Sequence, residues 1–396
     1  MLNDPRPQNQ SAATAAEIAT LLVSFELSEG RWVVTMRPPV SSRLSCFSIP
    51  ARDTEKLLTL LTTQREQAER RSHRAVKVVS IYEAGRDGFW LHRWLLALES
   101  HVVDPASILG PQRRRKAKAD SIDGEKLRSL AMWLGGEPGV CSMVTPPSVA
   151  QEDQRRLSRE RDESVRERTR LSNGINGLLA NQGIAGFKPL QKGARQVLDV
   201  LRTGDGHALA PHLRTTNERI LQRLDLLRQQ ITAAETERDG LLQAAPVGAA
   251  SAGTNQAESR ETAIARQLFR LRSIGPEFAT LLPAECFYRR FDNRRQVAAF
   301  AGLAPTPWAS GGVEREQGIS KAGNRRLRRT LIELAWSWTR RQPDSTLTRW
   351  FRNKVAGQGT RMRRIAIVAL ARKLLVALWR YVTDGVVPEG AVLKAG

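Results

Sequence analysis

The chain has 396 residues, 41% of them hydrophobic, which is enough for two or three folded units with separate cores. Its 62 Lys and Arg against 40 Asp and Glu give a net charge of +22, so polyanions are the expected partners. No uninterrupted apolar run reaches the roughly 18 residues of a membrane span. The nearest candidate, residues 365–378, contains Arg372 and Lys373. The composition therefore favours nucleic acid over a membrane.

The three cysteines lie far apart in the sequence, with no nearby pair of the kind that binds zinc: Cys46, Cys141 and Cys286. This usage fits a reducing, cytoplasmic compartment. Residues 1–18 lack an apolar secretion core and are expected to form a disordered tail.

Residues 19–145 show the alternation of an α/β domain. The pattern predicts three strands, a helix, a strand, a helix, a strand and a helix, in the order 21–27, 31–36, 44–49, 54–70, 76–82, about 88–99, around 102 and about 120–134. This order is typical of an RNase H-like or RuvC-like domain, although other α/β folds share it.

The remainder of the chain is expected to be mainly helical. Residues 146–243 contain two long helices, 149–180 and 213–242, and the second has apolar residues at every seventh position: Leu213, Ile220, Leu227, Ala234 and Leu241. This pattern indicates a coiled coil, which pairs either within the chain or between protomers. Residues 244–262 are predicted to be a flexible linker. Residues 263–384 are predicted to form a basic helical domain with a loop at 302–318, and 385–396 a tail.

Acidic residues recur where an α/β domain builds sites. Glu83 follows the buried strand 76–82, Glu26 lies on the first strand, and Asp120 and Asp123 lie three residues apart at a helix start. Clustered carboxylates hold Mg²⁺ or Mn²⁺, so these four residues are candidate metal ligands. A plainer interpretation stays open, in which Asp120 caps the helix, Asp123 complements its dipole and Glu26 faces solvent.

The segment around Ser310 offers a candidate nucleophile. Ser310-Gly311-Gly312 lies in the predicted loop, and the helix that follows it begins with arginines. Cations and helix amides there would stabilise attack of the serine oxygen on a phosphate. Ser-Gly-Gly is also ordinary loop sequence, so the residues alone leave both interpretations open.

Two basic stretches are candidate nucleic-acid contacts. Residues 313–364 contain fourteen Lys or Arg against four Asp or Glu, and a basic loop spans residues 112–118. The candidate contacts are Arg113, Arg114, Arg115, Lys116, Lys118, Lys321, Asn324, Arg325, Arg326, Arg328 and Arg329. The interleaved tryptophans Trp336, Trp338 and Trp350 are more typical of a core than of base stacking.

Four parts of the sequence together resemble the bacterial transposases of the insertion sequence 110 group, relatives of the Piv and MooV DNA invertases. These parts are Glu83-Ala84-Gly85 after a strand, residues 118–123, the end of the coiled coil at 178–184, and a C-terminal block covering 298–305, 310–312 and 318–328. The resemblance spans most of the chain.

The resemblance implies a RuvC-like domain with an Asp-Glu-Asp-Asp metal tetrad and a C-terminal transposase domain whose serine attacks DNA. Glu83, Asp120 and Asp123 match the last three acids, and Ser310 matches the nucleophile. Glu26 stands where the family has aspartate, and its extra methylene could shift a ligand by about 1.5 Å, which matters for Mg²⁺.

The resemblance further implies a covalent serine-DNA intermediate and oligomers, dimers or tetramers, held by the coiled coil. It also implies an element-encoded guide RNA and action at the bacterial nucleoid. The expected function is therefore site-specific DNA recombination by a transposase. Two alternatives remain: a RuvC-like nuclease of branched DNA, which would not need Ser310, and a nucleic-acid-binding scaffold with an impaired metal site, for which Glu26 is the direct support.

Overall fold

A computed structural model describes residues 18–83, 85, 88–104, 121–137, 140–243, 259–310, 313–321 and 323–394, and the side chains of Ala97 and of residues 121–125 and 306–317 lie outside this description. The chain divides into two compact units between Pro147 and Ser148. Among the helices described, none combines the length and the apolar character that a bilayer span requires.

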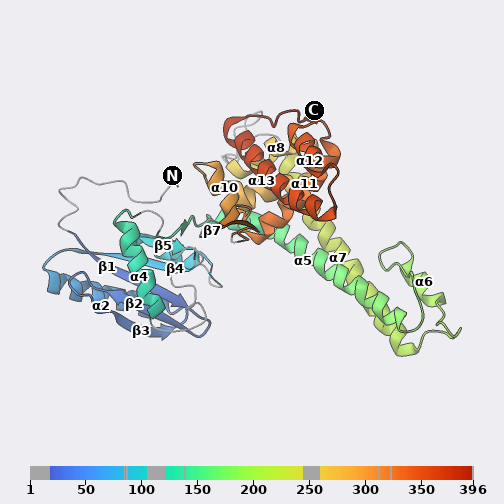
Figure 1. Cartoon of the computed structure of the whole chain (residues 1–396). Helices are drawn as coiled ribbons and strands as arrows, with labels where there is room; N and C mark the ends of the chain where they lie inside the picture. Colours follow the sequence, from blue (N-terminus) through green and yellow to red (C-terminus); the bar gives the residue numbers. More distant parts are fainter. Residues whose placement is uncertain are drawn as a thin grey trace, which may run out of the picture. The chain divides into compact units, whose positions relative to one another are not determined.

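The first unit is built on a six-stranded mixed sheet with the strand order β3-β2-β1-β4-β5-β6 (Figure 1). Its strands are β1 (Ala19–Leu27), β2 (Arg31–Arg37), β3 (Ser45–Pro50), β4 (Val76–Glu83), β5 (Ser100–Val103) and β6 (Met143–Val144). β1, β4 and β5 are parallel, whereas β2, β3 and β6 run antiparallel to their neighbours. The predicted α/β class is confirmed, and β6 is an addition to the prediction.

One helix covers each face of this sheet. α2 (Thr54–Ser72) packs on one face over a core that includes Phe25, Val78 and Tyr82. α4 (Ser121–Leu134) packs on the other, where Leu127 and Leu130 meet the strand side chains. Alternation of side chains along each strand supplies both apolar faces.

The helix predicted at about 88–99 is wrong. The chain there forms a five-residue helix α3 (Trp90–Trp94) and a short 3-10 turn η1 (Leu96–Leu98). Glu99 then adopts a left-handed backbone conformation, with φ of 49°, which ends the turn and directs the chain into β5. The apolar spacing of this stretch comes from two short turns rather than one helix.

The second unit begins with a pair of long helices. α5 (Val149–Ala180) and α7 (Pro211–Gln243) pack against each other within the chain, and α6 (Ala194–Val200) lies in the connection between them (Figure 1). We call α5, α7 and the connecting residues 181–210 the stalk. The buried seam of α7 includes Leu227 and Ala234 from the predicted repeat, together with Leu224 and Ile231. Of the two pairings left open by the sequence, the structure shows the one within the chain.

The rest of the second unit packs around one large core (Figure 1). Its helices are α8 (Arg260–Phe269), α9 (Pro276–Leu282), the π-helical turn η4 (Pro283–Phe287), α10 (Arg294–Phe300), α11 (Arg325–Arg341), α12 (Thr346–Val355) and α13 (Thr360–Asp384). A hairpin of β7 (Pro305–Ser310) and β8 (Val313–Ile319) stands in place of the predicted loop at 302–318.

Two further segments differ from the sequence prediction. α8 begins at Arg260, with the Ser259 side chain as its N-cap, so the last residues of the predicted linker are helical; residues 244–258 lie outside the described residues. The predicted tail is docked as far as Lys394. The amides of Arg272 and Lys394 bond to carbonyls of Val392 and Arg270 across the two segments.

Candidate functional site

Two acidic residues occupy equivalent positions on neighbouring strands at the carboxyl edge of the sheet. β1 and β4 run parallel, and Phe25 and Tyr82 are their last paired residues, so Glu26 and Glu83 come next on each strand. Phe25 and Tyr82 point into the core beneath α2. Because successive strand residues alternate between faces, Glu26 and Glu83 lie on the face that α4 covers.

A buried lysine on α4 pairs with one of these acids. Nζ of Lys126 lies 3.4 Å from Oε1 of Glu83. The Lys126 side chain is only 7% exposed, whereas Glu83 keeps 38% of its side chain exposed and Glu26 is exposed. Carboxylates gathered in one place repel each other unless a cation compensates them. Lys126 provides such a charge from within the chain.

The remaining predicted metal ligands are described only in part. Asp123 is the third residue of α4 and lies three residues before Lys126, whereas Asp120 and the basic residues 113–118 lie outside the described residues. In the described part of the chain, no group of three or more His, Cys, Asp or Glu is arranged to hold a metal ion.

The carboxylates of Glu26 and Glu83 are nevertheless the oxygen donors that Mg²⁺ prefers. The edge fits a divalent cation in the chemistry of its donors, although two carboxylates alone do not complete the ligand set of such an ion.

Ser310 lies at the tip of the hairpin. It is the last residue of β7 and pairs with Val313, the first residue of β8, across two glycines. A two-residue Gly-Gly connection is a common turn between antiparallel strands. The amides of Ser320 and Lys321, just after β8, donate to carbonyls of the residues that follow α10, which fixes the base of the hairpin.

Gly323 completes this base because no side chain fits there. Its φ of 113° is a backbone conformation that favours glycine, and a Cβ would lie 2.5 Å from the carbonyl oxygen of Phe300. The next amide, that of Asn324, donates to the same oxygen over 2.9 Å. The Asn324 side chain then caps α11 by accepting from the amide of Leu327. The hairpin and the start of α11 are therefore packed onto the end of α10.

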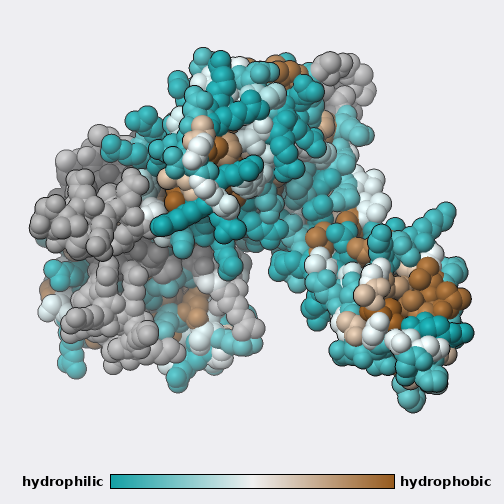
Figure 2. Space-filling view, turned by 45° about the vertical axis from the view of Figure 1, so that its right-hand side comes forward, coloured by the Kyte–Doolittle hydropathy of each residue, from teal (hydrophilic) through white to brown (hydrophobic). Residues whose placement is uncertain are grey.

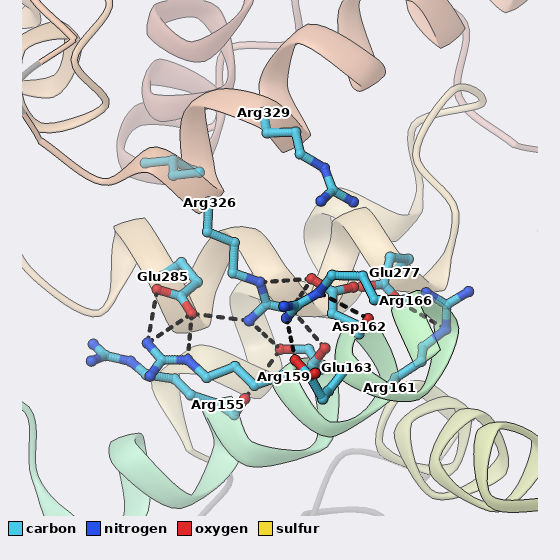
Figure 3. A network of polar contacts seen from close by, with 12 residues as sticks. Arg155, Arg159, Arg161, Asp162, Glu163, Arg166, Glu277, Glu285, Arg326 and Arg329 are labelled. Carbon is cyan, nitrogen blue, oxygen red and sulfur yellow. Dashed lines mark hydrogen bonds and ion pairs between the residues drawn. The ribbon is translucent and has the colours of Figure 1, made fainter. Parts of the chain in front are cut away.

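A buried carboxylate joins the start of α11 to the stalk. Glu285, on η4, is 3% exposed and accepts hydrogen bonds from Arg159 of α5 at 3.1 and 3.4 Å, and from Nδ2 of Asn324 at 3.0 Å (Figure 3). Burial opposes its ionisation, but the hydrogen bonds and charge of Arg159, with Asn324 and Arg326, outweigh this and lower the pKa of Glu285. Glu285 is therefore a charged anchor between two helices.

Arg326 belongs to the same network. Figure 3 shows its side chain reaching from α11 toward α5, between Glu285 and Asp162. Its guanidinium lies 3.1 Å from Oε1 of Glu285 and 3.0 Å from Oδ2 of Asp162, and it also donates to the carbonyl of Ser158 over 2.6 Å. These partners satisfy the guanidinium within the chain, so the structure gives Arg326 a packing role.

The other predicted nucleic-acid contacts near α11 differ in their surroundings. Lys321 and Arg325 are exposed. Arg329 is exposed and pairs with Glu333 over 3.0 Å. Arg328 donates to the carbonyls of Lys321 and Ala301 and is half-buried. Asn324 is occupied as a helix cap and as a partner of Glu285. Lys321 and Arg325 are therefore the residues of this block that remain most available to a phosphate.

Two residues of the site were missed from sequence. Lys126 stands beside Glu125 and two residues before Arg128 on α4, so nothing local marks it as the buried cation, whereas Glu285 is a single acid in the run Pro283-Ala284-Glu285-Cys286-Phe287. A lone charge within an apolar stretch is a signal for a buried ion pair, because unpaired charges are rarely buried. The signal does not name the partner. Glu26 and Glu83 belong to the first unit and Ser310 to the second.

Comparisons with known proteins bear on the whole chain. Residues 265–350 match the family model described as transposase, IS116/IS110/IS902 family. Over 394 residues, and 98% of both chains, the sequence is 49% identical to y4rJ of Sinorhizobium fredii, a protein named as a transposase. It is 29% identical, over 68% of this chain and 73% of the relative, to the transposase of insertion sequence element IS1328 of Yersinia enterocolitica. It is also 27% identical, over 70% and 71%, to the transposase of element IS1111A of Coxiella burnetii. This chain belongs to the IS116/IS110/IS902 family of transposases.

Proposed function

We propose that this transposase cuts and rejoins DNA with two groups of residues: the carboxylates of Glu26, Glu83, Asp120 and Asp123, and the hydroxyl of Ser310. The observation that supports this most is the placement of Glu26 and Glu83 at equivalent positions on parallel neighbours, on one face of the sheet. The strand order β3-β2-β1-β4-β5, with β2 antiparallel, supports a RuvC-like first unit.

The carboxylates would hold Mg²⁺ or Mn²⁺, which when bound supplies positive charge to the attacking and leaving oxygens at a phosphate. Glu26 and Glu83 would contribute from the strands, and Asp120 and Asp123 from the beginning of α4. Lys126 keeps Glu83 charge-compensated before any cation arrives. Glutamate at position 26, in place of the family's aspartate, gives this site a longer ligand arm.

Ser310 would act as the nucleophile at a backbone phosphorus. Its oxygen would form a phosphoester with DNA, its proton would pass to a base or to water, and a deoxyribose oxygen would leave. The ester conserves the phosphate linkage, so a second deoxyribose hydroxyl can attack it and restore the DNA strand. Position at the tip of a hairpin with a fixed base supports this role, because the tip can enter a DNA groove while the base stays in place.

We further propose that an element-encoded RNA guides the reaction, and that protomers associate through the stalk into a dimer or tetramer at the bacterial nucleoid. Apolar residues gather at the end of the stalk that carries α6 (Figure 2), and Val200 there is 71% exposed. This patch supports association of the stalk with a second copy. In such an oligomer, the acids of one protomer would act with Ser310 of its partner.

A strand-joining assay tests the proposal. Element ends, target DNA and the noncoding RNA that flanks the gene are incubated with the parent, Ser310→Ala or Asp120→Asn. The proposal predicts joined product from the parent alone, with DNA binding retained in all three proteins. Joined product from Ser310→Ala would exclude the serine mechanism. Binding without joining by the parent would favour a nucleic-acid-binding scaffold.

Mixing the two variants tests the shared site. Asp120→Asn and Ser310→Ala chains should restore joining together if acids and serine act between protomers. Absence of rescue in the mixture would count against that arrangement.

A further inference from the structure

Most arginines on the stalk have an acidic partner. Arg161 pairs with Glu235 over 2.6 Å, and Arg223 pairs with Glu167 over 2.7 Å. Further pairs form at spacings of three residues along α5, such as the pair of Arg170 with Glu167. The stalk is therefore rich in arginine without carrying a large uncompensated charge.

The last two helices of the chain, in contrast, carry basic residues without acidic neighbours in sequence. Residues 345–383, which form α12 and most of α13, contain nine Lys or Arg and no Asp or Glu. We call the exposed cations at the meeting ends of the two helices the α12–α13 surface: Arg349, Arg352, Lys354, Arg361, Arg363 and Arg364. Within the described residues, none of the six forms an ion pair with a carboxylate.

The part of this charge that lies at the start of α13 is unfavourable for that helix. Arg361, Arg363 and Arg364 lie in the first two turns of α13, where the helix dipole already presents positive charge. The first turn of α13 has no acidic residue, and its N-cap, Gly359, offers no side chain. Like charges at short spacing along a helix also repel one another. The arrangement costs stability in the free protein, and an external anion would offset that cost.

Aromatic side chains hold part of this surface in place. The guanidinium of Arg363 lies 5.4 Å from the ring centre of Trp336 on α11, and Nζ of Lys373 lies 4.8 Å from that of Trp350 on α12. Trp336 in turn packs edge-on against Phe351. These contacts tie α11, α12 and α13 together, so the cations project from a packed support rather than from a loose segment.

We propose that the α12–α13 surface binds the phosphate backbone of duplex DNA without reading its sequence. This rests on the proposed function and adds a second DNA contact to Lys321 and Arg325. Duplex DNA presents about one charge per 1.7 Å of its axis, which suits several unpaired arginines on adjoining helix ends. Arg352 and the cations after it lie beyond residues 265–350, so the family-model match does not account for them.

Salt dependence of DNA binding tests this surface. The full-length parent is compared with the triple variant Arg352→Gln, Arg361→Gln and Arg364→Gln, using a labelled duplex of arbitrary sequence between about 50 and 200 mM salt. The control variant Arg156→Gln, Arg170→Gln and Arg195→Gln removes the same charge from stalk arginines that have acidic partners.

The surface variant should bind DNA about tenfold or more weakly than the parent at the lower salt concentration. Its plot of log association constant against log salt should also be shallower, with a slope smaller in magnitude by about 2 to 3. The control should keep the parent slope. An unchanged slope in the surface variant, or an equal loss in the control, would overturn the proposal. The same titration with a duplex RNA of the same sequence gives a further comparison. A loss of affinity for the RNA duplex, without a loss for the DNA duplex, would also overturn the proposal.

Further measurements separate a loss of DNA contact from misfolding of the variant and from failure of the proposed function. Thermal unfolding should show the surface variant about as stable as the parent, because loss of Arg361 and Arg364 from the positive end of the α13 dipole offsets loss of Arg352 from the negative end of the α12 dipole. If the triple variant does not fold, Arg352→Gln alone should lower the slope by about 1, and no change would overturn the proposal. The two proposals fail separately. Strand joining by Ser310→Ala would refute the serine mechanism without affecting the salt dependence of DNA binding. An unchanged salt dependence in the surface variant would refute the α12–α13 surface without affecting the serine mechanism.

Discussion

The ammonium of Lys126 and the carboxylate of Glu83 form an ion pair of 3.4 Å on the face of the sheet where Glu26 also lies. A buried lysine that pairs with a partly exposed acid competes with any cation that approaches that acid. The pair therefore connects the fold of the first unit to its proposed metal chemistry.

Replacing Lys126 with methionine keeps the length of the side chain and removes the competing charge. Mn²⁺ should then bind about fivefold more tightly, which is about 1 kcal/mol for a partly exposed pair. Isothermal titration of the full-length protein measures this, with Arg128→Gln on the exposed side of α4 as the control. Weaker Mn²⁺ binding by Lys126→Met would show that the lysine orders the ligands instead of competing with the cation.

Glu285 predicts a pH dependence of stability. Its pKa is lowered from the ordinary value of 4.5 by Arg159, Asn324 and Arg326 against the effect of burial. The folded state therefore holds this proton less firmly than the unfolded state, so the stabilisation is present above about pH 4.5 and is lost as the pH falls toward the folded pKa. Glu285→Gln should be less stable by about 3 kcal/mol at neutral pH.

Urea unfolding of the parent and Glu285→Gln at several pH values checks this. The two free energies of unfolding should converge as the pH falls from about 6 to about 3. A difference that stays constant over this range would mean that the charge of Glu285 does not stabilise the fold.

Arg326 and Arg325 are neighbours with different expected roles. Arg326→Gln should lower the free energy of unfolding by about 3 kcal/mol, because Asp162 loses its ion pair with Arg326 and the buried Glu285 keeps only Arg159 and Asn324. Arg325→Gln should change it by less than about 0.5 kcal/mol and should weaken DNA binding. Urea unfolding and a binding titration on each variant separate the two effects. Equal destabilisation by both substitutions would contradict the structure.

Gly323 is expected to be required at the base of the hairpin. Gly323→Ala should destabilise the second unit by more than about 1 kcal/mol, since it adds a Cβ against the end of α10 at a positive φ. Gly318 provides a matched control, with φ of 85° and no atom within 4 Å of an added Cβ. Thermal unfolding should place Gly318→Ala between the parent and Gly323→Ala, and the reverse order would show that the close approach is unimportant.

The sequence predicted those parts of the fold whose signals are local. Short strand-like segments predicted β1 to β3, a buried apolar run predicted β4, and the apolar repeat predicted the long stalk helices. The hairpin is absent from the sequence prediction because the prolines and glycines of residues 302–318 favour a loop, although two glycines between strands are also typical of a tight turn. The helix at about 88–99 was overpredicted because apolar spacing does not reveal the left-handed residue Glu99 that ends it.

In the candidate site, too, the sequence predicts what depends on local pattern and does not predict contacts between distant residues. Glu83 could be placed at a strand end because it follows a buried run, whereas the residues around Ser310 leave two interpretations open, and the family resemblance favours the nucleophile. Arg326 stands among arginines that the sequence predicts as phosphate contacts, and the structure adds its partners within the chain. Its partner Asp162 lies 164 residues away in sequence, and no local pattern indicates such a pairing.

The most direct test of the account is detection of the serine-DNA bond itself. Labelled DNA ends are incubated with the parent, Ser310→Ala or Ser320→Ala, together with the flanking RNA and Mg²⁺, and the products are denatured before electrophoresis. We predict that label migrates with the parent and with Ser320→Ala, whose serine lies after the hairpin, and that peptide mapping places it on Ser310. Label attached equally to Ser310→Ala would contradict the account.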